Sequence, residues 1–138
     1  MDDSSKDGIK KATKKARSRG ISLDGHGGFS RHVLLCSHSN CRGDHDEGKE
    51  TRKRLQTRLK ALANEGIRVY RSQVDCLSIC RSGPLMVVYP EGTWYHSVTP
   101  EVLDRIIDEH IVGGKVVEEY AFARNPLCAM GTAFESGR

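Results

Sequence analysis

The sequence predicts a small α/β domain whose elements follow one another in the order βαββα, in which the hairpin of the third and fourth strands counts as one β unit. Three observations predict this class: short apolar runs of strand length, one long segment of strong helix formers between the first two runs, and a capped amphipathic segment after the last. The chain has 138 residues, of which 37% are hydrophobic, so it can bury one core of ordinary size without disulfide bonds.

The first strand and the first helix are separated by a polar loop. HVLLC, residues 32–36, is an apolar run of strand length, and the turn-rich residues after it predict the loop. Residues 47–64 consist of strong helix formers, and Gly66 follows them as a terminator. The apolar side of this helix is marked by residues at helical spacing: Leu55, Leu59 and Leu62. Its exposed surface is basic.

Three further strands are predicted after this helix. IRVYR, residues 67–71, is the second strand, and PLMVVYP, residues 84–90, is a third strand with apolar residues on both faces. TWYHSV, residues 93–98, pairs back on the third strand as a hairpin through the turn at Glu91 and Gly92.

A second helix closes the predicted domain. Thr99, Pro100 and Glu101 supply an N-cap, a proline in the first turn and an early acid, and Gly113-Gly114 ends the segment. A buried stripe runs along it: Val102, Leu103, Ile106, Ile107 and His110. The region around this helix is acidic, so we expect the domain to offer docking surfaces of both signs.

The helix between the first two strands supplies the crossover that a parallel pair needs, and the hairpin and second helix complete a small mixed sheet covered by helices. This layout is thioredoxin-like in outline. We expect the domain to occupy residues 29–117, between a basic tail at residues 1–28 and a C-terminal extension at residues 118–138.

The tail carries the whole formal charge of the chain. Residues 1–20 hold seven basic and three acidic side chains, whereas the rest of the chain holds 15 of each sign, so the net +4 belongs to this segment. The segment has few apolar residues to pack, so we expect a solvated, disordered extension followed by a glycine-rich linker. We expect no nucleic-acid partner.

The N-terminus lacks the apolar core of a signal peptide, and no run approaches the roughly 18 apolar residues that a membrane span requires. We therefore expect a soluble, cytoplasmic protein with no membrane partner. Structural disulfides are uncommon in that compartment, so the five cysteines favour metal ligation or redox chemistry.

The cysteines fall into two pairs and one single residue. Cys36 and Cys41 follow the first predicted strand, Cys76 and Cys80 follow the second, and Cys128 stands alone. Loops that follow two parallel strands leave the sheet at the same end, so four thiols are expected to converge. Four convergent thiolates are a soft-ligand site that selects zinc or an iron–sulfur cluster.

The spacing favours a two-iron cluster over zinc, because zinc knuckles usually have two residues between their ligands, whereas these pairs have four and three. The chain lacks the Cys-x-x-Cys pair of a thioredoxin-type dithiol and the second Cys-His half of a Rieske centre. A local zinc site would leave Cys76 and Cys80 without a role; its ligands would be Cys36, His38, Cys41 and His45.

Cys36-x4-Cys41, followed by Cys76-x3-Cys80 in DCLSICRSGPLMVVYPEGTWYHSVTPEVLDRIIDEHIVGGK, resembles the thioredoxin-like [2Fe-2S] ferredoxins. This family is related to the small iron–sulfur subunit of NADH dehydrogenases and hydrogenases. The match covers residues 30–117, and its motifs occur together and in order. The basic tail and the segment that carries Cys128 depart from a minimal member of the family.

The resemblance implies that a [2Fe-2S] cluster is ligated by Cys36, Cys41, Cys76 and Cys80, and that the protein is a homodimer. We expect a one-electron carrier that is not an enzyme on its own and that exchanges electrons with redox partner proteins, a reductase or an oxidoreductase. Two alternatives stay open: a structural zinc-binding module, or a cluster-bearing regulatory or complex subunit. We expect Cys128 to be a packed or idle thiol.

Overall fold

The structure is a computed structural model that describes residues 3–36, 45–74, 77, 79 and 83–127. The chain divides into two compact units, residues 1–30 and 31–138, and each is described by itself. The limits that we expect for the domain, 29 and 117, stay a prediction.

The first unit contains helix α1, Asp3–Ser18, where the sequence suggested a disordered tail. Local interactions account for this difference. Asp7 and Lys11, one helical turn apart, form an ion pair at 3.0 Å. The N–H of Ile21 closes the last turn on the carbonyl of Ala16 at 3.0 Å. Lysine and alanine also favour helix, so the segment has helical propensity although it has little to pack.

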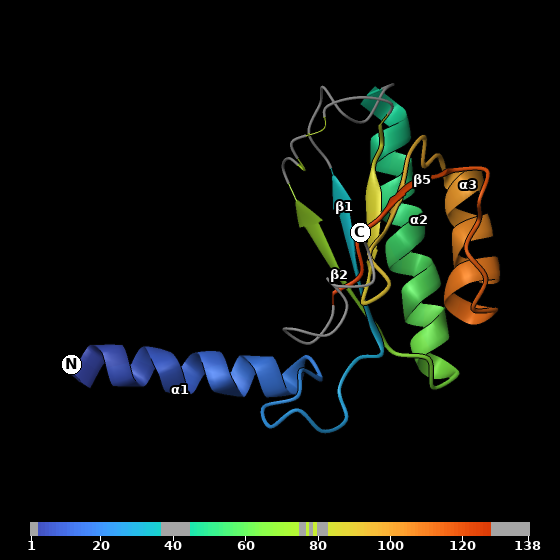
Figure 1. Ribbon diagram of the computed structural model, residues 1–138. Helices are drawn as coiled ribbons and strands as arrows, with labels where there is room; N and C mark the ends of the chain where they lie inside the picture. The colour runs from blue at the N-terminus through green and yellow to red at the C-terminus, as the bar shows by residue number, and fades with distance from the viewer. Residues whose placement is uncertain (1–2, 37–44, 75–76, 78, 80–82, 128–138) are drawn as a thin grey trace. The chain divides into compact units, whose positions relative to one another are not determined.

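The second unit is built on a five-stranded mixed sheet with the strand order β2-β1-β3-β4-β5 (Figure 1). β1 pairs in parallel with β2, and the other three pairings are antiparallel. The strands are β1 Arg31–Cys36, β2 Val69–Val74, β3 Met86–Tyr89, β4 Thr93–Tyr95 and β5 Ala121–Arg124. The predicted parallel pair and the predicted hairpin are both confirmed.

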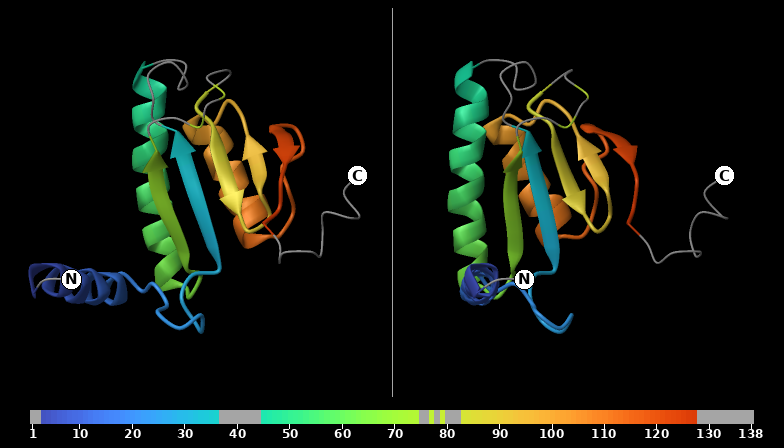
Figure 2. Two further views of the ribbon diagram at one scale, coloured as in Figure 1. Left: turned by 60° about the vertical axis from the view of Figure 1, so that its left-hand side comes forward. Right: turned by 90° about the vertical axis from the view of Figure 1, so that its left-hand side faces the viewer.

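Both helices of this unit lie on one face of the sheet (Figure 2). α2, His45–Asn64, is the crossover between β1 and β2. α3, Pro100–Arg105, continues into a π-helical segment, η1, Ile106–Val112. The N–H of Val102 donates to the hydroxyl of Thr99 at 3.3 Å, which is the predicted N-cap. The order βαββα is confirmed.

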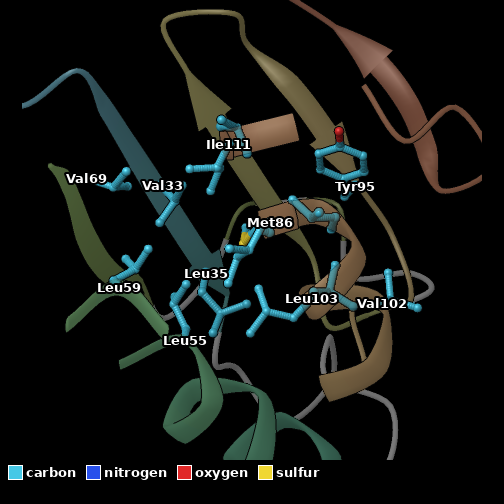
Figure 3. Packing of buried hydrophobic residues seen from close by; sticks show 14 of the residues in the cluster. Val33, Leu35, Leu55, Leu59, Val69, Met86, Tyr95, Val102, Leu103 and Ile111 are labelled. Atoms are coloured by element: carbon cyan, nitrogen blue, oxygen red, sulfur yellow. The ribbon is translucent and has the colours of Figure 1, made fainter. Parts of the chain in front are cut away.

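The hydrophobic core lies between this face of the sheet and the helices (Figure 3). Alternate residues of β1, Val33 and Leu35, point into it, as the period of two in a strand requires. The helices contribute the predicted stripes, among them Leu55 and Leu103. The predicted apolar side of α2 and the predicted stripe of α3 and η1 are both buried.

Two elements differ from the prediction. β2 begins two residues later than expected and extends to Val74, because the N–H of Ile67 first closes the end of α2 on the carbonyl of Leu62 at 3.0 Å. β5 is an additional strand in the segment expected as an extension, and it pairs with the free side of β4. The sheet therefore has one strand more than βαββα.

Candidate iron–sulfur site

Cys36 lies at the C-terminal end of β1, the strand that β2 and β3 flank on either side. Its side chain is 1% exposed and packs with Leu85, with Val74 and Leu77 beside them. The N–H of Cys36 donates to the carbonyl of Leu85 at 2.9 Å. A sulfur donor is thus fixed at the C-terminal end of an interior strand, with apolar residues around it.

The end of β2 lies directly beside Cys36. In the parallel register Cys36 is opposite Val74, and Cys76 follows Val74 by two positions in the sequence. The chain therefore leaves β1 and β2 at the same edge of the sheet. This is the topological requirement for two cysteine pairs, each following one of these strands, to approach one another.

Of the four predicted ligands, only Cys36 belongs to the described residues. Cys41, Cys76 and Cys80 lie outside them, as do His38 and Cys128, and of His45 the side chain is not described. Within the described part of the chain, no three His, Cys, Asp or Glu side chains form a group that could hold a metal ion. The four-cysteine site therefore stays a prediction.

Ile79 stands between two of the predicted ligands in the sequence and is 44% exposed. Leu77, two positions before it, is half-buried against Cys36. This segment thus places one apolar side chain against the sheet and another toward solvent. The thiol of Cys36 is a soft donor of the kind that binds soft metal centres, and the apolar residues packed around it shield it on the sheet side.

The opposite end of the sheet, where β1 begins, carries a buried polar network. His110 of η1 is 1% exposed; its Nδ1 lies 2.7 Å from the hydroxyl of Tyr95, and its Nε2 lies 2.7 Å from the carboxylate of Glu91. Arg31 donates to the same carboxylate at 2.7 Å. Both ring nitrogens of His110 are hydrogen-bonded within the fold.

This network was not predicted from the sequence. Glu91 gave only a turn signal, and His110 only a place in an apolar stripe. Burial lowers the pKa of His110 more than its hydrogen bond to Glu91 raises it. Burial also raises the pKa of Glu91, but the hydrogen bonds from Arg31 and His110 outweigh it and leave that pKa lowered.

Some of the charged residues on the two helices pair with one another, and the expected docking surfaces of both signs stay a prediction. Arg54 of α2 is 2.5 Å from the carboxylate of Asp104. Arg58 is 3.1 Å from the same carboxylate and 2.5 Å from Asp108. Because α2 and the following helical segment pack side by side, Arg54 and Arg58 of one neutralise Asp104 and Asp108 of the other.

Comparisons with known proteins agree with this fold. A protein assigned as a 2Fe-2S ferredoxin in Priestia megaterium is 33% identical over 93 residues, which are 67% of this chain and 69% of that protein. A 2Fe-2S ferredoxin of Clostridium pasteurianum is 30% identical over 92 residues, which are 63% of this chain and 90% of that protein. No family model matches the chain.

Solved structures point the same way. A thioredoxin-like [2Fe-2S] ferredoxin from Aquifex aeolicus aligns with a TM-score of 0.62 and 25% identity, covering 75% of this chain and 99% of its own. A second structure of that protein, the wild type at 1.5 Å resolution, aligns with a TM-score of 0.60 and 26% identity, covering 70% of this chain and 99% of its own.

The helix-backed mixed sheet, the thiol at its edge and these likenesses define an iron–sulfur protein of the ferredoxin class. More narrowly, the chain belongs to the family of thioredoxin-like [2Fe-2S] ferredoxins. A [2Fe-2S] cluster is therefore the cofactor that its membership supports. Among the helices described, none is long and apolar enough to cross a membrane.

Proposed function

We propose that the protein is a one-electron carrier whose [2Fe-2S] cluster is ligated by Cys36, Cys41, Cys76 and Cys80. The observation that carries the proposal is the parallel register in which Cys36 lies opposite Val74. One cysteine pair begins at the end of β1, and the other begins two positions after the end of β2. Both pairs therefore follow neighbouring parallel strands at the same end of the sheet, which supports a shared centre.

When bound, such a cluster accepts and releases a single electron. The chain itself anchors and shields the site. The hydrogen bond from the N–H of Cys36 to Leu85 fixes the main chain at the first ligand, and Val74 and Leu77 exclude water on the sheet side. Exposed Ile79 supports a shallow site that a second protein can approach.

Anaerobic purification of the full chain tests this assignment. We expect a brown protein with visible charge-transfer bands and, after reduction, an electron paramagnetic resonance signal. Replacing Cys76 or Cys80 by Ser should remove or destabilise the cluster, whereas Cys128→Ser should leave the visible spectrum unchanged. Loss of colour in Cys128→Ser would show that the ligand set is wrong. A colourless protein with one zinc ion per chain would instead establish the zinc-binding module.

We further propose that the protein passes electrons between redox partner proteins, a reductase or an oxidoreductase, and converts no substrate on its own. Its cytoplasmic location is part of the same proposal. If the purified chain alone transfers electrons between a reductase and an acceptor protein, it acts as a carrier. A regulatory or complex subunit would transfer electrons only within its assembly.

A homodimer completes the proposal. In the described part of residues 31–127, both helices pack on one face of the sheet (Figure 2). The other face carries half-buried apolar and aromatic side chains, among them Leu34 and Trp94. Sedimentation velocity should give twice the 15.3 kDa mass of the chain. We expect Phe122→Asp, which places a charge beside Trp94, to shift the protein toward monomer, and a wild-type monomer would contradict the assignment.

A further inference from the structure

Several charged groups of the second unit form ion pairs with one another. Besides the pairs between α2 and α3, Arg105 pairs with Glu109 at 2.9 Å and with Glu119 at 3.3 Å. Arg124 pairs with Glu118, and Arg31 pairs with Glu91. Residues 21–138 also hold equal numbers of basic and acidic side chains. This part of the chain therefore generates little net field for attracting a charged partner.

Helix α1 has the opposite character, and we call it the basic arm. Four of its basic residues recur at spacings of four, four and three, which places them along one side of the helix: Lys6, Lys10, Lys14 and Arg17. Asp7 is paired with Lys11, which lies off this row. The row therefore presents four positive charges over about three turns of helix.

The basic arm has almost nothing apolar with which to pack. Ile9 is its largest apolar side chain and is 54% exposed. Like charges at a spacing of four repel one another and destabilise a helix. An anionic surface would relieve this repulsion. A bilayer fits less well, because helices that lie on membranes bury a broad apolar face with large side chains.

We propose that the basic arm is a docking element for an acidic redox partner protein. This inference rests on the proposed electron-carrier function. The neutral domain would present the site of electron transfer, while the arm would supply the long-range attraction and hold the partner nearby. Such attraction raises association rates and weakens as salt screens it.

The test compares two full-length variants that lose the same four positive charges. The arm variant is K6Q/K10Q/K14Q/R17Q, and glutamine keeps the helical propensity of lysine and arginine. The matched control is K49Q/K60Q/R71Q/K115Q, which changes exposed residues of the second unit. The probe is cytochrome b5, an acidic haem protein. Its ferric haem gains one electron to become ferrous while the reduced carrier loses one.

Stopped-flow measurement of haem reduction at 10 mM ionic strength should show a rate constant about five- to tenfold lower for the arm variant and changed less than twofold for the control. The difference should vanish at 500 mM salt. Equal rates for the arm variant and the wild type at 10 mM would overturn the proposal. A loss of rate in the control as large as that in the arm variant would also overturn it.

Binding supplies a readout that does not depend on the cluster. The wild type should bind ferric cytochrome b5 at least fivefold more tightly than the arm variant at low salt, and circular dichroism should show added helix in the complex. Tighter binding of a 20-base-pair DNA duplex or of phosphatidylserine vesicles at 150 mM salt would overturn an acidic protein as the partner. A colourless preparation would reject the carrier function, and the binding measurement would still decide the docking proposal.

Discussion

Replacing Tyr95 by Phe removes one hydroxyl that two buried groups share. Tyr95 of β4 is fully buried. Its hydroxyl accepts the N–H of Val117 at 3.1 Å and lies 2.7 Å from Nδ1 of His110. The arrangement is complete when the tyrosine donates to Nδ1 and His110 donates from Nε2 to Glu91. Tyr95→Phe would leave the amide of Val117 and one ring nitrogen of His110 without this partner.

The expected loss is large for a single oxygen atom. A buried polar group that loses its partner costs about 1–3 kcal/mol, so the two groups together should cost about 2–6 kcal/mol. A domain has roughly 5–15 kcal/mol of stability in all. At about 3–4 °C for each kcal/mol in a chain of this length, the melting temperature should fall by roughly 6–24 °C.

Urea denaturation followed by far-ultraviolet circular dichroism at pH 7.5 measures this loss. Tyr89→Phe is the matched control. It removes the hydroxyl of a half-buried tyrosine in β3, and this hydroxyl makes no hydrogen bond among the described residues. The free energy of unfolding should therefore change by less than about 0.5 kcal/mol. If Tyr95→Phe also changed the free energy of unfolding by less than about 0.5 kcal/mol, the network would not stabilise the fold as argued.

Three further predictions concern the same scaffold. Burial lowers the pKa of His110, so between about pH 6.5 and that lowered pKa the unfolded chain binds a proton that the folded chain does not. The free energy of unfolding should therefore fall as the pH drops through this range. Urea titrations at pH 7.5 and 5.5 measure this dependence, and His110→Asn should flatten it. Gly92→Ala should detach β5, since Gly92 has a φ of 70° and an added Cβ would lie 2.0 Å from the carbonyl oxygen of Asn125. Amide hydrogen exchange at residues 121–127 should then become faster. Gly66→Ala, with open space around its Cβ, should leave the exchange at these residues unchanged. Leu103→Ala should cost about 2–5 kcal/mol in the same urea assay, and a loss under 1 kcal/mol would show that this part of the core is loosely packed.

The parts of the fold that the sequence predicted well are those with a local or periodic signal. The leucines of α2 repeat at the spacing of a helix, and the cap at Thr99 needs only three following residues. The parallel pairing followed from a topological rule, because a helix between two strands supplies a crossover. These signals do not depend on which distant residues meet.

The elements that the sequence did not predict depend on distant partners. β5 has no alternating apolar pattern, and only Ala121 of its four residues is half-buried. It forms because the free side of β4 offers hydrogen bonds and because Gly92 lets Asn125 approach closely. The ion pairs between Arg58 and Asp108 join residues 50 positions apart, which composition alone cannot pair.

One part of the candidate site also had a local sequence signal, and the other part depends on how distant strands pair. The spacing of the cysteines is a local signal and indicated the type of ligand. The shared edge required the register of β1 against β2, and the structure supplies it for Cys36 and Val74. Ligation by the other three cysteines depends on two loops beyond the ends of these strands, so it remains a matter for the spectroscopic test.

The two ends of the sheet have separate tasks in this scheme. Glu91 and His110 lie at the end where β1 begins, and Cys36 lies where β1 finishes. Five residue steps of strand separate these ends by about 17 Å. Because Coulomb energy falls with distance, a charge gained by His110 would act more weakly at Cys36 than at Glu91, whose carboxylate lies 2.7 Å from its Nε2. The fold therefore holds its titrating network at one end of the sheet and the proposed cluster site at the other.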